Sequence, residues 1–183
     1  MYEVEVKLRA DHAAIRTSLE AVDADFLGTV TQTDDYYNHP TRDFAGTDEA
    51  LRIRREHNDH DEQGELTYKG PLVEVESKTR RELQSAIGDA QTVASILDAL
   101  GFDRAATVRK TRDRYSLDGF TVSLDTVEGV GSFVEVEIVA PESAIEDERD
   151  RAYDVLRRLG LDPSEHIRTS YLELVLGSAD NPR

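Results

Sequence analysis

Apolar and polar residues alternate with a period of two along much of this chain. In residues 2–9, Val4, Val6 and Leu8 occupy one side and charged residues occupy the other. Because successive side chains of a strand point to opposite faces, this pattern predicts a β-strand with one apolar and one ionic face. The same signal predicts seven further strands, in residues 29–38, 50–56, 65–70, 77–84, 106–117, 120–129 and 131–139. Asp118-Gly119, between two of these segments, is typical of a two-residue hairpin turn, so we expect neighbouring strands to be antiparallel.

Helical periodicity appears between groups of these strands. It predicts three helices, in residues 11–26, 89–102 and 143–160. We expect Phe26 to belong to the apolar stripe of the first helix. Ser143 and Glu146 fit a capping box at the start of the third. A short final helix or turn follows Pro163. Helices inserted between groups of antiparallel strands indicate an α+β fold.

The polar faces of the predicted strands are strongly ionic, and they carry all four lysines of the chain. These faces contain Glu3, Glu5, Lys7, Arg9, Arg52, Arg54, Lys69, Lys78, Arg80, Glu82, Lys110, Arg112, Arg114, Asp125, Glu135 and Glu137. If each strand is considered alone, the ordinary interpretation is a sheet with helices on its apolar side and solvent on the other. If the eight strands are considered as one sheet, that sheet tends to curl and close, which would make the ionic face the lining of a barrel.

A charged barrel lining has to be paired, hydrated or neutralised by a ligand. Its lysines and arginines would suit a polyanion, most simply a chain of phosphates. Its carboxylates would suit divalent cations such as Mg²⁺ or Mn²⁺. The dipeptide Asp34-Asp35 with the two tyrosines that follow is better explained as strand packing with a surface charge pair than as part of a site.

The composition fits one acidic globular domain. The 183 residues carry a net charge of −16, and only four of the 22 basic residues are lysines. Such a surface is typical of adaptation to high salt. No apolar run approaches the roughly 18 residues of a membrane span, and no signal peptide is visible, so we expect a cytoplasmic protein. The absence of cysteine excludes disulfides and thiolate chemistry. The charge also makes nucleic acid a poor partner.

Several motifs, taken in order, resemble one known family. The opening "EVEVK" fits an ExExK signature, and "LRIR", "YKG", "VRKTR", "SLD" and "VEVE" follow in the same order. Together they resemble the CYTH superfamily, and the ending "SYLEL" resembles its class IV adenylate cyclase branch. The resemblance implies a closed or nearly closed eight-stranded antiparallel tunnel with helices outside. It covers a single domain, residues 1–177, which leaves 178–183 as a short flexible tail.

The resemblance also assigns roles to the ionic residues. Metal ligands for Mg²⁺ or Mn²⁺ would be Glu3, Glu5, Asp125, Glu135 and Glu137. Phosphate oxygens would be held by Arg52, Arg54, Lys69, Lys78, Arg80, Lys110 and Arg112. The catalytic group would comprise Lys7, Glu5 and Lys110, with Lys7 either contacting phosphate or acting as general base. Whether Arg80 or Arg81 faces the tunnel stays open at this stage.

The implied substrates are small molecules that carry a triphosphate. We expect an enzyme like the class IV cyclases, converting ATP to cyclic AMP and pyrophosphate. One alternative is a triphosphatase acting on tripolyphosphate, thiamine triphosphate or nucleoside triphosphates. A second is a nucleotide- or polyphosphate-binding module without turnover. The resemblance also allows for a homodimer.

Overall fold

A computed structural model describes residues 1–58, 61–73 and 79–179 of the chain. Its eight strands are β1 Tyr2–Arg9, β2 Asp25–Asn38, β3 Ala50–His57, β4 Glu62–Leu72, β5 Arg80–Ile87, β6 Asp103–Leu117, β7 Phe120–Val127 and β8 Gly131–Ala140. Its helices are α1 His12–Ala21, α2 Phe44–Thr47, α3 Ala90–Ala99, α4 Ile145–Arg158 and α5 Tyr171–Ala179. Short 3₁₀ turns at Glu142–Ala144 and Pro163–Glu165 flank α4.

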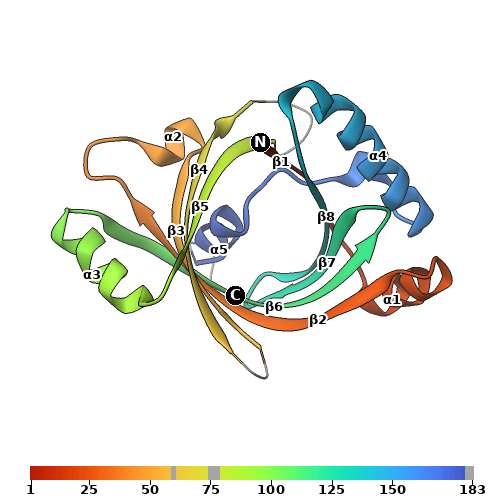
Figure 1. Cartoon of the computed structure of the whole chain (residues 1–183), viewed down its shortest axis with the longest axis horizontal. Coiled ribbons are helices and arrows are strands. Elements are labelled where there is room, and N and C mark those ends of the chain that lie inside the picture. The colour runs from red at the N-terminus through yellow and green to blue at the C-terminus, as the bar shows by residue number, and fades with distance from the viewer. Residues whose placement is uncertain (59–60, 74–78, 180–183) are drawn as a thin grey trace.

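The eight strands form one closed antiparallel barrel, as the sequence predicted. Their order around the barrel is β1-β5-β4-β3-β2-β6-β7-β8, and β8 pairs with β1 to complete the ring (Figure 1). Most neighbours pair over seven or more residues. In the described part of the chain, β1 and β5 pair through just two positions, Tyr2 with Arg81 and Glu3 with Arg80.

The main hydrophobic core lies outside the barrel, between its wall and helices α1 and α4. Val6 of β1 and Val136 of β8 pack there against Leu19 of α1 and Leu156 of α4. Each such fully buried side chain contributes roughly 1.5–3 kcal/mol of transfer free energy. The apolar strand faces therefore point outward to the helices, which leaves the ionic faces to line the interior.

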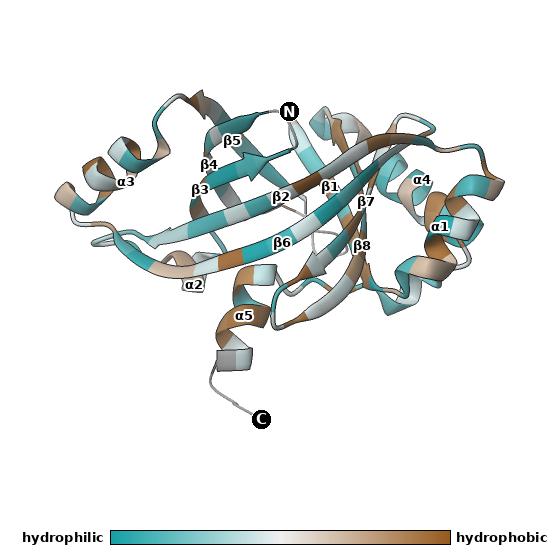
Figure 2. Ribbon diagram, turned by 90° about the horizontal axis from the view of Figure 1, so that it is seen from below, coloured by the Kyte–Doolittle hydropathy of each residue, from teal (hydrophilic) through white to brown (hydrophobic). Residues whose placement is uncertain are grey.

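Helices α3 and α5 lie at two other places on the barrel. Helix α3 packs on the opposite outer side, where Leu97 contacts Tyr37 and Ile53. Helix α5 lies across one end of the barrel, as the two perpendicular views show (Figures 1 and 2). No helix among the described residues is both long enough and apolar enough to cross a lipid bilayer.

Two details of the sequence-based assignment were wrong. Helix α1 ends at Ala21, and Phe26 lies in strand β2, exposed and packed on Tyr115. The chain leaves the helix through Asp23, whose φ of 55° lies in the left-handed region. Ser143 does not cap α4, because a 3₁₀ turn intervenes and the helix begins at Ile145.

The predicted hairpin turn is confirmed. Asp118 and Gly119 both have positive φ, 52° and 88°, as a type I′ turn requires. At the C-terminus, α5 extends to Ala179, and the rest of the expected tail lies outside the described residues.

Candidate active site in the tunnel

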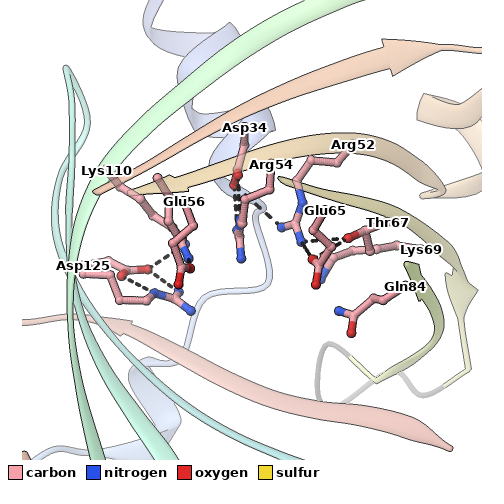
Figure 3. A network of polar contacts seen from close by, with 12 residues as sticks. Asp34, Arg52, Arg54, Glu56, Glu65, Thr67, Lys69, Gln84, Lys110 and Asp125 are labelled. Atoms are coloured by element: carbon pink, nitrogen blue, oxygen red, sulfur yellow. Dashed lines mark hydrogen bonds and ion pairs between the residues drawn. The ribbon is translucent and has the colours of Figure 1, made fainter. Parts of the chain in front are cut away.

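The interior of the barrel is a cavity of about 600 Å³, and half of the residues that line it are charged. Its lining follows from the period of two: residues 3, 5 and 7 of β1 face inward while residues 4, 6 and 8 are buried under the helices. Strands β2, β3, β4, β5, β6 and β8 contribute charged residues in the same way. Figure 3 shows side chains from several of these strands converging on the same space.

Three carboxylates meet on one wall of the tunnel. The pairing of β1 with β8 places Glu5 directly opposite Glu137 and Lys7 opposite Glu135. One oxygen of each of Glu5, Glu135 and Glu137 lies within 4.8 Å of the other two. Burial, opposed by Arg112 and reinforced by neighbouring glutamates, raises the pKa of Glu137 to about 7. We call these three residues the glutamate triad.

Cationic side chains border the glutamate triad. The Nζ atom of Lys7 lies 3.6 Å from Glu5 and 3.7 Å from Glu135. Arg112 of β6 forms an ion pair with Glu135 and lies 4.0 Å from Glu137. The negative charge of the triad is therefore only partly balanced by its neighbours.

A second cluster joins β6 to β7. Arg112 donates two hydrogen bonds of 2.6 Å to the two carboxylate oxygens of Asp125, and Lys110 donates a third of 3.1 Å. Asp125 is completely buried, and burial alone would raise its pKa, but these cations outweigh that effect and hold the pKa far below its usual range. Burial, together with the neighbouring charge of Arg112, lowers the pKa of Lys110 to about 8.

A third cluster joins β2 to β3. Arg54 donates two hydrogen bonds of 2.7 Å to the carboxylate of Asp34, and Arg52 lies 3.7 Å from the same group (Figure 3). Arg52 also donates to Thr67 at 3.2 Å and contacts Glu65 at 3.5 Å. Burial would raise the pKa of Asp34, but the two arginines outweigh it and keep that pKa well below its usual value.

A fourth cluster lies where β1, β4 and β5 meet. The Nζ atom of Lys69 donates to Glu3 at 3.1 Å and forms an ion pair with Glu82. Burial raises the pKa of Glu82 to about 8, against the opposing charge of Lys69 and with the support of Glu3. Burial also acts to raise the pKa of Glu3, but Lys69 overcomes it and the net pKa is low.

The structure distinguishes the two arginines at the start of β5. Arg80 is buried and lines the tunnel, where it donates to the carbonyl oxygen of Asp48 at 2.8 Å and to its carboxylate at 3.1 Å. Arg81 is exposed. Lys78 lies outside the described residues.

The tunnel thus brings most of the predicted site residues into one cavity, although in separate groups. Of the five predicted metal ligands, only Glu5, Glu135 and Glu137 come together. Glu3 is bound by Lys69, and Asp125 by Lys110 and Arg112. Carboxylate oxygens in this arrangement suit a hard divalent cation, so the triad fits Mg²⁺ or Mn²⁺.

Sequence reasoning missed several residues of the cavity region, and three of them bear directly on the site. Asp34 is a buried partner of two tunnel arginines rather than part of a surface charge pair. Glu82 was placed on the ionic face but given no role. Tyr171 of α5 lines the cavity and was noticed only as part of the ending motif. The alternation of β2 could have revealed Asp34, because it shares a face with the buried Gln32.

A closed antiparallel barrel with cations and carboxylates inside defines a class of tunnel-shaped proteins. The CYTH domain family profile matches residues 1–171, and the chain belongs to this family. The barrel architecture and the resemblance predicted from the sequence are therefore both confirmed.

Relatives match over nearly the full chain. A Methanocaldococcus jannaschii protein named as a candidate adenylate cyclase, MJ0240, is 37% identical and covers 95% of this chain and 98% of its own. Adenylate cyclase CyaB of Aeromonas hydrophila is 30% identical, over 94% of this chain and 88% of its own.

Solved structures agree on the fold. The PH1819 protein of Pyrococcus horikoshii has a TM-score of 0.89 at 39% identity, covering 96% of this chain and 98% of its own. The Hippeastrum protein HpAC1, described as having a dominant triphosphatase activity, has a TM-score of 0.68 at 19% identity, covering 96% of this chain and 95% of its own. At that identity the likeness to HpAC1 extends to the fold alone. The two curated relatives are thus both named as adenylate cyclases, and the solved structures support the barrel fold.

Proposed function

We propose that this chain is a divalent-metal-dependent enzyme that converts ATP to cyclic AMP and pyrophosphate inside the tunnel. The observation that carries the proposal is the glutamate triad, which lies beside lysines and arginines in one enclosed cavity. A triphosphate with its divalent ion needs both kinds of group at once. The relatives named as adenylate cyclases favour this reaction over others of the family.

The chain's own residues would act mainly by positioning. Arg52, Arg54 and Lys69 would hold phosphate oxygens from one wall, and Lys110 and Arg112 from another. The 3′-hydroxyl would then lose its proton to solvent water, and its oxygen would form a bond to the α-phosphorus in line with the bond that breaks to release pyrophosphate. A divalent ion on the triad would neutralise charge on the phosphate oxygens. Lys7, beside the triad, would contact phosphate from the same side.

A triphosphatase is the second candidate. The cations of the cavity come from several strands and can surround a bare tripolyphosphate, without any need for a nucleoside. In this reaction water would attack a terminal phosphorus, the bond from that phosphorus to its bridging oxygen would break, and the remaining diphosphate would leave, which yields orthophosphate as the second product. The activity described for the Hippeastrum protein makes this a natural alternative within the fold. In either case the partner is a small triphosphate compound, and a homodimer and a cytoplasmic location remain predictions.

The test is a product assay. Purified protein in KCl with Mg²⁺ or Mn²⁺ is given ATP in one series and tripolyphosphate in another. Cyclic AMP with an equal amount of pyrophosphate supports the cyclase, whereas orthophosphate from tripolyphosphate supports the triphosphatase. Tight binding of ATP with no product from either compound would contradict both enzymatic candidates and leave a binding module.

A further inference from the structure

Tyr171, the first residue of α5, is the aromatic side chain on which two tunnel lysines converge. The Nζ atom of Lys7 lies 4.3 Å from the centroid of its ring, and that of Lys110 lies 4.8 Å away. The two lysines come from different strands, β1 and β6, and both are buried. Ammonium groups at these distances are attracted to the ring electrons, and the attraction strengthens away from water.

The position of this ring is fixed by packing. Tyr171 is 7% exposed and makes an edge contact with Phe133, with ring centroids 5.1 Å apart. Val108 and Val127 belong to the same cluster, and Val175 of α5 packs against it. These strand residues share inward faces with Lys110, Asp125 and Glu135, so the cluster closes the end of the tunnel next to the ionic groups.

The hydroxyl of Tyr171 is buried, and it has no hydrogen-bond partner among the described residues. A buried hydroxyl without a partner is costly, and such an atom in a native protein calls for an explanation. Burial raises the pKa of this phenol well above its ordinary value, and the charges of Glu135 and Asp125 act in the same direction. Tyr171 also lines the cavity together with Lys7 and Lys110, so its side chain borders the ionic interior.

We propose that Tyr171 positions both lysines and binds the substrate. Its ring holds the ammonium groups of Lys7 and Lys110, and its hydroxyl donates a hydrogen bond to an oxygen of the bound triphosphate. The inference rests on the proposed function of the tunnel as a triphosphate site. It gives α5 a direct part in that site, and it supplies the hydroxyl with the partner that the described residues do not provide.

The role of the ring can be tested without any substrate. The chain has only four lysines, so ¹³C-lysine labelling gives a simple NMR spectrum, assigned with Lys7→Arg and Lys110→Arg. In the wild type, ring currents should displace the side-chain signals of both lysines. Tyr171→Phe keeps the ring and should keep the displacement, whereas Tyr171→Leu should shift both signals toward the position of an exposed lysine.

The role of the hydroxyl requires a ligand, and inorganic tripolyphosphate is the probe. By calorimetry, Tyr171→Phe should bind it about tenfold more weakly, since one hydrogen bond to a charged group is lost. Tyr171→Leu should bind it about 100-fold more weakly. Ser178→Ala, on the same helix but exposed and outside the cavity lining, is the control and should stay within threefold of wild type. Thermal unfolding checks that each variant is folded.

The outcomes separate this inference from the proposed function. A wild-type protein that does not bind tripolyphosphate would overturn both. If the wild type binds it and Tyr171→Phe binds equally well, the hydroxyl contact is wrong. If Tyr171→Leu leaves the lysine signals unmoved, the positioning role is wrong. Binding without turnover would contradict the enzymatic proposal and leave the role of Tyr171 intact.

Discussion

Asp34 and Arg54 lie directly opposite each other on β2 and β3 and share two hydrogen bonds of 2.7 Å. Asp34 is buried in the tunnel wall, the side chain of Arg54 is 14% exposed, and Arg52 lies 3.7 Å from the same carboxylate. Removing one member of a buried pair leaves the other charge without compensation. We therefore expect Asp34→Asn to lower the free energy of unfolding at pH 7 by about 3 kcal/mol.

This loss should depend on pH in a defined direction. The folded-state pKa of Asp34 is depressed, so its carboxylate stabilises the fold above the ordinary carboxyl pKa of about 4 and stabilises it progressively less as the pH falls below that value. Guanidinium unfolding at pH 7, 5 and 3 should show the gap between wild type and variant narrowing toward pH 3. Asp154→Asn, which removes an exposed ion pair with Arg157, is the control and should change little. If the difference in free energy of unfolding between wild type and Asp34→Asn is the same at all three pH values, the depressed pKa of Asp34 is wrong.

Glu137→Gln should abolish turnover without unfolding the protein. The change removes one of three clustered carboxylates, so it weakens metal binding while relieving repulsion between like charges. We expect turnover to fall at least about 100-fold, with a melting temperature equal to or above that of wild type. Glu20→Gln changes the same charge on the exposed face of α1 and should keep full activity. Activity that survives Glu137→Gln would mean that the metal lies elsewhere.

The neighbouring arginines of β5 provide a matched pair for phosphate binding. Arg80→Ala removes a cation from the tunnel and should weaken tripolyphosphate binding about tenfold, the effect of losing one charge-assisted hydrogen bond. Arg81→Ala changes an exposed side chain and should stay within twofold. Calorimetry at one fixed KCl concentration measures both. Equal effects would indicate that the arginines act only through overall charge.

The net charge of −16 predicts stabilisation by salt. Raising KCl from 0.1 to 1 M shortens the screening length from about 10 to about 3 Å, which reduces repulsion between surface acids. We expect the melting temperature to rise by roughly 5 °C, followed by differential scanning fluorimetry. A variant with Glu20, Glu142 and Asp147 changed to neutral amides should respond less. A melting temperature that is independent of KCl would argue against adaptation to high salt.

Most strands and helices could be predicted from the sequence, because the patterns that indicate them lie within short stretches of the chain. Strand β1 was predicted with its observed limits, and the inward direction of Glu5 and Glu137 followed from their position in the alternation. What alternation cannot supply is the register between strands. That register decides that Glu5 faces Glu137 and that Arg112 faces Asp125. This is why the triad could not be separated from the buried ion pairs in advance.

The misread residues have the same physical origin. Asp34 looked like a surface acid because acidic residues are abundant throughout the chain, and only its partner strand shows that it meets Arg54. The choice between Arg80 and Arg81 depended on how β5 aligns with β4, where the pairing is irregular between Lys69 and Leu72. Phe26 continued a helical stripe by spacing alone, although the chain had already turned at Asp23.

Among the described residues, the pairing of β1 with β5 is the shortest in the barrel and involves two positions on each strand. Beside this pairing, Lys69 reaches across from β4 to Glu3 on the first strand. A bound anion would contact Lys69 of β4 and Arg80 of β5, and its divalent cation would bind to β1 and β8. The ligand would therefore link the strands on both sides of the short β1–β5 pairing and stabilise it. Loading the tunnel should therefore slow amide exchange along β5 more than along β2 or β6, whose mutual pairing is long.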